Sequence, residues 1–252
     1  RIPLILMNSF KTDADSLEVL TRYPELKTNV PRSFLQHMFP KIHAETLTPA
    51  SYPENPQLEW NPAGHGNIYL SLATSGILDH LLNQGYRYAF VSNIDNLGAN
   101  LDLNILGYFA SSKLSFLMEV TERTWMDRKG GHLARHKNGN LILREAAQCP
   151  KSDLEHFKDI SKHQFFNTNN IWINLIDLKN LLIQKNFCLD LPLIRNCKKL
   201  DPVDQSSPDI IQIESAMGAA ISIFERSSAI EVPRTRFAPV KNCEELLLLW
   251  SD

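Results

Sequence analysis

The chain has 252 residues, and its 26 lysines and arginines against 28 aspartates and glutamates give a formal net charge of −2. This balance supplies no basic field for a nucleic-acid backbone, and no segment approaches the ~20 apolar residues of a membrane span, so we expect neither a nucleic acid nor a membrane as partner. The cysteines lack a CxxC spacing, which implies neither a zinc site nor a disulfide framework and favours a reducing cytoplasm. They are Cys149, Cys188, Cys197 and Cys243.

Strand-like and helix-like segments alternate along the chain, which favours an α/β fold with a mixed sheet. We expect a helix at 16–23, a long connection rich in proline and polar residues at 24–62, and an amphipathic helix at 68–83 closed by Gly85. Further on we expect a strand at 88–91, a helix at 101–110, a strand at 114–120, a hairpin with strands at 132–136 and 141–147, a strand at 165–175, and helices at 178–186 and 210–224.

Both ends of the sequence lie inside apolar segments. Residues 2–7 are typical of a central strand, and residues 246–250 of an apolar helix. Domains usually begin and end in exposed polar segments, so we expect the chain to be an internal part of a larger protein.

The segment that follows residues 88–91 combines small polar residues with one carboxylate. The apolar run predicts a buried strand, and Asn93, Asp95 and Asn96 follow its carboxyl end. Ligands of open α/β sheets bind at such strand ends, and Mg²⁺ takes one or two carboxylates together with substrate phosphates. Asp95 is therefore a candidate ligand for a metal and a phosphate. The alternative, of about equal weight, is that these side chains only form a turn or cap the next helix.

Three further segments could carry chemistry. Gly64-His65-Gly66 precedes a predicted helix, where backbone N–H groups can approach an anion, although a plain loop and helix start would look the same. Residues 166–170 offer three amides and a hydroxyl, which suit sugar hydroxyls, with a polar turn as the commoner explanation. Lys241 follows an apolar lead-in and could deliver an ammonium to a phosphate, or could simply be a solvated surface lysine.

Read together, nine segments resemble the eukaryotic-type UDP-glucose pyrophosphorylases, or UTP–glucose-1-phosphate uridylyltransferases. The segments occur in the family's order from residue 2 to Lys241, and the ordered set is highly specific although each one is weak alone. They are IPLILMNSFKTD, GHGNIY, FVSNIDNLGANLD, FLMEVTERT, KGG, EAAQCPK, FNTNNIWIN, IQIESAMGAA and VPRTRFAPVK.

The resemblance implies a single, partial nucleotidyltransferase domain over residues 1–252, with a Rossmann-like mixed sheet of the sugar-nucleotide transferase type. It implies that UTP and glucose-1-phosphate react with Mg²⁺ to give UDP-glucose and pyrophosphate, by in-line attack of a phosphate oxygen on the α-phosphorus of UTP. An anionic nucleophile needs no general base, so positioning and charge neutralisation do the work. The GHG and SNIDNLGA segments favour glucose over N-acetylglucosamine.

The resemblance also implies how the nucleotide and sugar phosphate are held. Gln36 matches a glutamine that recognises uracil, although the residues around it follow the family only loosely. Gly64 matches a backbone contact to the same base, and His65 a histidine that contacts the sugar phosphate.

Four positions match residues around the sugar and the metal. Asn93 matches an asparagine on the sugar or ribose, and Asp95 the carboxylate beside metal and phosphates. Asn169 matches a hexose-binding residue, with Glu145 as a second hydroxyl partner, and Lys241 matches the lysine that neutralises the phosphates. Lys241 and Asp95 are thus the expected catalytic residues.

The sequence departs from the family in one respect. We find neither the Gly-rich phosphate loop after the first sheet strand nor the carboxy-terminal β-helix domain, so we expect low activity unless the chain is extended at its amino terminus. Two other interpretations stay open: a non-catalytic sugar-nucleotide-binding relative, and a pyrophosphorylase of another or broader sugar specificity. The resemblance also leaves a homo-oligomer open.

Overall fold

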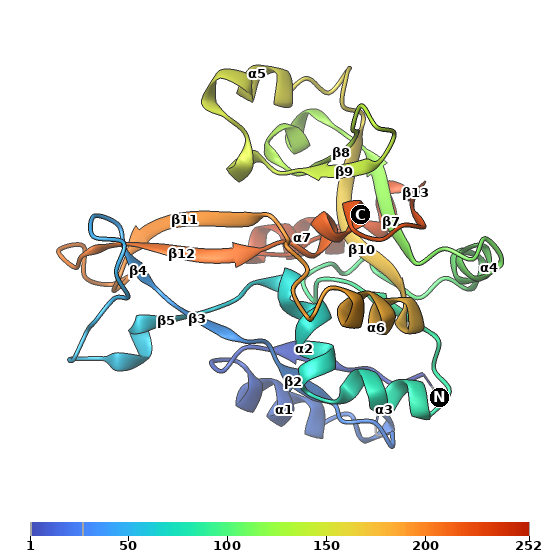
Figure 1. Ribbon diagram of the computed structural model, residues 1–252, viewed down its shortest axis with the longest axis horizontal. Helices are drawn as coiled ribbons and strands as arrows, with labels where there is room; N and C mark the ends of the chain where they lie inside the picture. The colour runs from blue at the N-terminus through green and yellow to red at the C-terminus, as the bar shows by residue number, and fades with distance from the viewer. Residues whose placement is uncertain (1, 27, 252) are drawn as a thin grey trace. The chain divides into compact units, whose positions relative to one another are not determined.

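The computed structural model describes residues 2–26 and 28–251, and its chain divides into two compact units (Figure 1). The first unit comprises Arg1–Gly85 and Lys185–Met217, and the second comprises Tyr86–Gln184 and Gly218–Asp252. The expectation of a single domain over residues 1–252 stays a prediction. Among the described residues, no helix is both long and apolar enough to cross a membrane.

The first unit is built from short sheets. β1 (Leu6–Asn8) pairs in parallel with β2 (Ser33–Leu35), β3 (Met38–Pro40) pairs antiparallel with β5 (Trp60–Pro62), and β12 (Asp209–Ser215) pairs antiparallel with both β11 (Leu193–Lys199) and β4 (Ile42–His43). Its helices are α1 (Asp13–Thr21), α2 (Ile68–Thr74) and α3 (Ile77–Asn83), with 3₁₀ turns η1 (Pro24–Leu26), η2 (Pro56–Glu59) and η3 (His65–Asn67).

The second unit is built on a mixed sheet in the order β13-β7-β10-β8-β9, with β6 on the same side of β10 as β8. Among the described strands of this sheet, only β13 and β7 pair in parallel. The strands are β6 (Tyr88–Val91), β7 (Phe116–Glu122), β8 (His132–Arg135), β9 (Leu141–Arg144), β10 (Phe165–Asn174) and β13 (Ser227–Glu231). The helices are α4 (Leu103–Ser111), α5 (Leu154–Phe157), α6 (Leu175–Gln184) and α7 (Cys243–Ser251), with 3₁₀ turns η4 (Trp125–Lys129), η5 (Ala146–Gln148), η6 (Lys151–Asp153), η7 (Met217–Ser222) and η8 (Arg234–Arg236).

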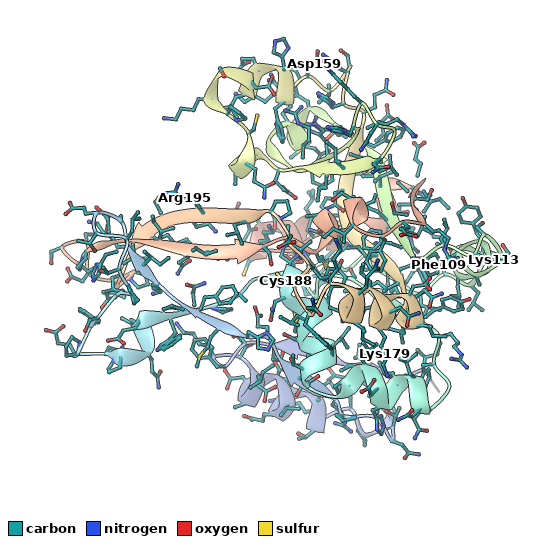
Figure 2. All side chains as sticks on the ribbon, viewed as in Figure 1. Phe109, Lys113, Asp159, Lys179, Cys188 and Arg195 are labelled. Carbon is teal, nitrogen blue, oxygen red and sulfur yellow. The ribbon has the colours of Figure 1, made fainter. Side chains whose placement is uncertain are left out.

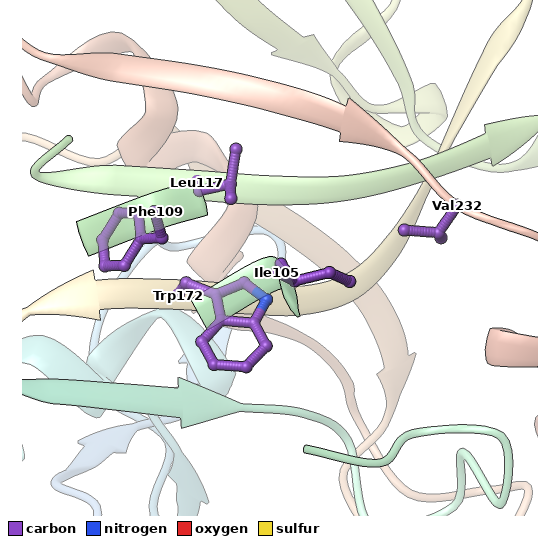
Figure 3. Packing of buried hydrophobic residues seen from close by; sticks show 5 residues of the cluster. All are labelled: Ile105, Phe109, Leu117, Trp172 and Val232. Carbon is purple, nitrogen blue, oxygen red and sulfur yellow. The ribbon is translucent and has the colours of Figure 1, made fainter. Parts of the chain in front are cut away.

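The core of the second unit lies where α4 covers the sheet. Ile105 and Phe109 of α4 pack with Leu117 of β7, Trp172 of β10 and Val232 (Figure 3). Charged side chains such as Lys113 and Asp159 lie on the outside of this unit, whereas Phe109 is fully buried (Figure 2). The helices and the mixed sheet confirm the α/β class. The packing also holds in place the ends of the strands, where the loops with the candidate site residues begin.

Several predicted elements agree with the structure. The strand at 88–91 is β6, the hairpin at 132–136 and 141–147 is β8 and β9, and the strand at 165–175 is β10. The hairpin turns through Gly139, whose φ of +94° suits glycine.

The helix predicted at 210–224 is wrong. Residues 209–215 form β12, and a 3₁₀ turn follows from Met217. Ile210, Ile211 and Ile213 are β-branched and all pair with β11, and Ile210 and Ile211 also pair with β4. These pairings outweigh the helical spacing of the later small residues.

Three other expectations need correction. The helix at 68–83 is broken into α2 and α3 at Gly76, whose φ of +79° does not fit a continuous helix. The connection at 24–62 contains β2 to β5 rather than irregular chain alone. The apolar run 2–7 becomes a strand only at Leu6 and, within the described part of the chain, pairs with β2 alone. Ile2 and Leu4, which precede this strand, are 68% and 49% exposed instead of buried.

Candidate functional site

The Gly64-His65-Gly66 loop of the first unit is held against the end of β12. A Cβ at Gly64, whose φ is +87°, would come within 2.9 Å of the Ser215 carbonyl oxygen, and one at Gly66 would come within 2.6 Å of Ser215 Oγ. Only glycine fits two such close approaches, so the glycines of this motif are needed for the local structure whatever the loop binds.

The predicted uracil and sugar-phosphate residues of the first unit lie together. The Gly64 N–H donates to Gln36 Oε1 at 3.1 Å, so the two residues predicted to contact uracil are hydrogen-bonded to each other. The Met217 N–H donates to His65 Nδ1 at 3.2 Å, which places the proton of the neutral imidazole on Nε2. Nε2 is then the hydrogen-bond donor of the ring, and a phosphate oxygen can accept from it.

In the second unit, Asp95 and Lys241 lie on two antiparallel segments. The Val240 N–H donates to the Asp95 carbonyl oxygen at 2.8 Å, and Asn96 forms an isolated antiparallel bridge with Pro239. Lys241 is exposed and follows Val240 directly, while the Asp95 side chain is half-buried. The structure therefore pairs the backbones of two segments that carry residues 146 positions apart in the sequence, and the roles of Asp95 and Lys241 stay predictions.

Asp95 does not cap the helix that follows it. The N-cap of α4 is Asp102, whose side chain accepts hydrogen bonds from the N–H groups of Asn104 and Ile105 at 2.7 and 3.3 Å. The turn interpretation holds for the backbone, since the Asn96 N–H donates to the Asn93 carbonyl at 3.1 Å. The capping interpretation of Asp95 is thus wrong, and its role as a metal and phosphate ligand stays a prediction.

Asn169 sits in a bulge of β10. The register with β7 shifts between Asn167 and Ile171, and Asn169 has a φ of +59°, a conformation that asparagine tolerates better than most residues. Asn167 supports the bulge in both directions: its Nδ2 donates to Asn169 Oδ1, and its Oδ1 accepts from the Asn169 N–H, each at 2.9 Å. The bulge turns the Asn169 side chain out of the regular alternation of the strand.

Glu145 lies beside the same bulge, directly after β9. A Cβ at Gly131 would come within 2.6 Å of Glu145 Oε1, and the Gly131 carbonyl oxygen accepts from the Asn167 N–H at 3.1 Å. Gly131 therefore gives the carboxyl group room and ties it to the strand that carries Asn169. Burial raises the pKa of Glu145 to about 7, so near neutral pH this group can accept or donate hydrogen bonds to a hydroxyl.

The residues present can contribute to a Mg²⁺ site but do not build one alone. Among the described residues, no group of three or more His, Cys, Asp or Glu side chains is placed to hold a metal. Mg²⁺ keeps several waters and is commonly held by one or two carboxylates plus substrate phosphates. A single carboxylate at Asp95, on a segment whose backbone pairs with the one that leads to Lys241, fits that donor set.

Sequence reasoning missed the buried ion pair between Glu119 and Arg236. The strand predicted at 114–120 stops one residue after Glu119, whereas β7 continues to Glu122 and leaves Glu119 inside the sheet with no exposed surface. Arg236 Nη2 lies 2.7 Å from Glu119 Oε1. The available signal was a charged residue within an apolar strand, which is almost always paired when it is buried.

A mixed α/β sheet whose loops carry amides, a carboxylate and a lysine fits the nucleotidyltransferase class. The family model for UTP–glucose-1-phosphate uridylyltransferase matches residues 1–252. The chain belongs to this family, which confirms the resemblance seen in its motifs.

Individual relatives agree with this assignment. The chain is 43% identical to a probable UTP–glucose-1-phosphate uridylyltransferase of Schizosaccharomyces pombe, covering all of this chain and 49% of that protein. It is 45% identical to the UTP–glucose-1-phosphate uridylyltransferase of Encephalitozoon cuniculi, of which it covers 48%. The chain therefore spans about half the length of the curated relatives it matches.

Solved structures show the same fold. The UDP-glucose phosphorylase of Trypanosoma brucei superposes with a TM-score of 0.92 at 49% identity, covering 98% of this chain and 54% of that one. A Leishmania major UDP-glucose pyrophosphorylase variant in complex with UDP-glucose gives a TM-score of 0.92 at 49% identity, covering 99% and 55%.

Proposed function

We propose that the protein carrying this chain is a UTP–glucose-1-phosphate uridylyltransferase. The observation that carries the proposal is the pairing of the Asp95 and Val240–Lys241 segments in a chain that belongs to this family. The finer description of the fold, a Rossmann-like sugar-nucleotide transferase domain over residues 1–252, is part of the proposal and is supported by the superposition on the Trypanosoma brucei enzyme.

The reaction sets simple electrostatic demands. A phosphate oxygen of glucose-1-phosphate attacks the α-phosphorus of UTP in line, the bond to the β-phosphate oxygen breaks, and pyrophosphate leaves with the electron pair. The nucleophile is an anion at neutral pH, so no side chain has to remove a proton. Lys241 neutralises phosphate charge as the reaction proceeds, and Asp95 holds Mg²⁺, which when bound polarises the phosphate oxygens.

The first unit supplies contacts to the base and the sugar phosphate. Gln36 Oε1 is engaged by the Gly64 N–H, which leaves the orientation of the Gln36 amide fixed and its Nε2 as the donor toward a uracil carbonyl. His65, with its proton on Nε2, donates to a phosphate oxygen of the sugar phosphate. In both roles a side-chain N–H group donates a hydrogen bond to an oxygen atom of the ligand.

The second unit supplies contacts to the sugar. Asn169, held in its bulge by Asn167, and Glu145, beside Gly131, present an amide and a carboxyl group to hexose hydroxyls. Asn93, at the turn after β6, binds the sugar or ribose. Glucose is the proposed hexose, and the complex of the Leishmania major enzyme with UDP-glucose supports that choice.

The proposal also covers the partners of the protein and its location in the cell. The proposed partners are UTP, glucose-1-phosphate, UDP-glucose and pyrophosphate, and a homo-oligomer stays open. A cytoplasmic location is proposed, supported by four cysteines that stand unpaired in the structure.

The test is pyrophosphate release from UTP, glucose-1-phosphate and Mg²⁺, with the Schizosaccharomyces pombe relative as positive control. Asp95→Asn and Lys241→Met are expected to abolish release, whereas Lys137→Met, a lysine on the exposed turn of the β8–β9 hairpin, is the matched control and keeps it. Equal rates in all three variants would refute the assigned roles.

Two outcomes would replace the proposal. UDP-glucose binding without turnover would indicate a non-catalytic sugar-nucleotide-binding relative. Equal or faster turnover of galactose-1-phosphate or N-acetylglucosamine-1-phosphate would indicate a pyrophosphorylase of another or broader sugar specificity.

A further inference from the structure

The second unit contains a buried polar cluster, here called the hub, made of Asn96, Glu119, Asn170 and Arg236. Their exposed fractions are 5%, 0%, 0% and 7%. Taking an ion pair and two amides out of water is costly unless every donor and acceptor is satisfied, and an apolar cluster would give as much stability without that cost. The hub therefore calls for an explanation beyond folding.

Glu119 forms the centre of the hub. Arg236 grips it with two N–H groups, Nε to Oε2 at 2.8 Å and Nη2 to Oε1 at 2.7 Å. Asn170 Nδ2 donates to Oε2 at 3.0 Å, and Trp172 Nε1 donates to Oε1 at 2.9 Å. Four donors around one carboxylate, two of them in a rigid guanidinium fork, fix its orientation.

Asn96 and Asn170 connect the hub to the loops. Asn96 Oδ1 accepts from the Ala238 N–H at 2.8 Å, while its Nδ2 donates to the Arg236 carbonyl at 3.0 Å and to Asn170 Oδ1 at 3.1 Å. Ser92 Oγ donates to the same Asn170 oxygen at 2.7 Å. The segment after β6, the bulge of β10 and the segment after β13 are thereby tied to one another.

Each of these three segments contributes a hydrogen-bonding residue within three positions of a residue of the proposed site. Asn96 follows Asp95, Asn170 follows Asn169, and Ala238 precedes Lys241 by three positions. Gly98 adds to the close fit, because a Cβ there would collide with the carbonyl oxygen of Thr235. The three segments come from sequence positions far apart, and the hub is what they share.

We propose that the four hub residues are positioning residues, which hold the segments of Asp95, Asn169 and Lys241 as one rigid set. The inference rests on the proposed function for its consequence in turnover, but the rigidity itself can be measured without it. Loosening the hub lets these three groups move independently, and a displacement of about 1 Å can cost on the order of 100-fold in rate.

The test uses the protein expressed from its complete gene and the variant Asn96→Asp. Aspartate has the shape of asparagine and keeps the acceptor for the Ala238 N–H, but it turns the donor for Asn170 and Arg236 into a second acceptor. We expect kcat to fall about 100-fold. Amide hydrogen exchange should accelerate together in residues 92–99, 167–170 and 236–241 and stay unchanged in the β8–β9 hairpin. Asn140→Asp, on the exposed hairpin turn, is the matched control and should change neither readout.

The outcomes separate the inference from the proposed function. The inference is refuted if exchange accelerates only in residues 92–99, or if it accelerates in the β8–β9 hairpin as well. A kcat within 2-fold of the value for the unsubstituted protein also refutes it. If the unsubstituted protein shows no turnover, the proposed function fails and the exchange pattern alone decides the hub. If Asn96→Asp does not fold, Arg236→Lys, which keeps the charge but loses the fork, is judged by the same readouts; if neither folds, the hub serves folding and the inference is wrong.

Discussion

Glu145 makes the stability of the protein depend on pH in an unusual direction. Burial raises the pKa of this carboxyl from its ordinary 4.5 to about 7, so the folded state binds its proton more tightly than the unfolded state does. Below pH 4.5 both states are protonated and the group costs nothing. Between 4.5 and about 7, unfolding releases a proton, and the free energy of unfolding falls by about 1.4 kcal/mol per pH unit. Above pH 7 the accumulated loss is about 3 kcal/mol.

Glu145→Gln isolates this effect. Glutamine has the shape of the protonated acid and does not titrate, so the variant should match the unsubstituted protein near pH 4.5 and exceed it by about 3 kcal/mol at pH 8. Urea unfolding followed by circular dichroism at several pH values measures the difference. Glu122→Gln, at the exposed end of β7, is the matched control for replacing a glutamate with glutamine.

A direct titration gives the result that would refute the reasoning. Carbon-13 NMR of the glutamate side chains, with Glu145→Gln identifying the resonance, should show a midpoint near pH 7. A midpoint below about 5, or a stability difference that is flat between pH 4.5 and 8, would show that the carboxyl group is well solvated. UDP-glucose should lower the midpoint if sugar hydroxyls donate to the carboxylate, which links the titration to the proposed sugar contact.

Other substitutions test the local structure by urea unfolding. Asp102→Ala removes the N-cap of α4 and should cost about 1 kcal/mol. Gly76→Ala should lower the free energy of unfolding by about 1–2 kcal/mol because of the positive φ alone, since no atom lies near the added Cβ. Gly64→Ala should lower it further, because the added Cβ would also collide with the Ser215 backbone. Equal losses in the two variants would contradict this close approach. Arg236→Met leaves Glu119 buried without its counter-charge and should cost about 3–5 kcal/mol, and a loss below 1 kcal/mol would show that water reaches the carboxylate.

The parts of the fold that the sequence predicted are those decided by short-range chemistry. The strand at 88–91 is a short apolar run, and the β8–β9 hairpin follows from an Asn-Gly turn between two alternating segments. Asp95 was predicted as a ligand because polar residues after a strand mark the sheet edge where ligands bind, whereas Asn169 was named by the family resemblance, and both roles stay predictions. The error at 210–224 arose because helical spacing was counted across a strand and a 3₁₀ turn, and the partners that make 209–215 a strand lie far away in the sequence.

The hub shows why part of the site could not be predicted in this way. A carboxylate inside the apolar run of β7 implies a buried partner, but the rule does not say which of the 26 lysines and arginines it is. The partner, Arg236, is 117 positions away, and the two amides that complete the hub resemble ordinary turn residues in their local sequence. Their proposed positioning role comes from pairing across three segments, which the arrangement of strands β6, β7, β10 and β13 brings about. The residues proposed to touch a substrate were therefore named from local motifs, whereas the residues proposed to hold them in place can be named only from the fold.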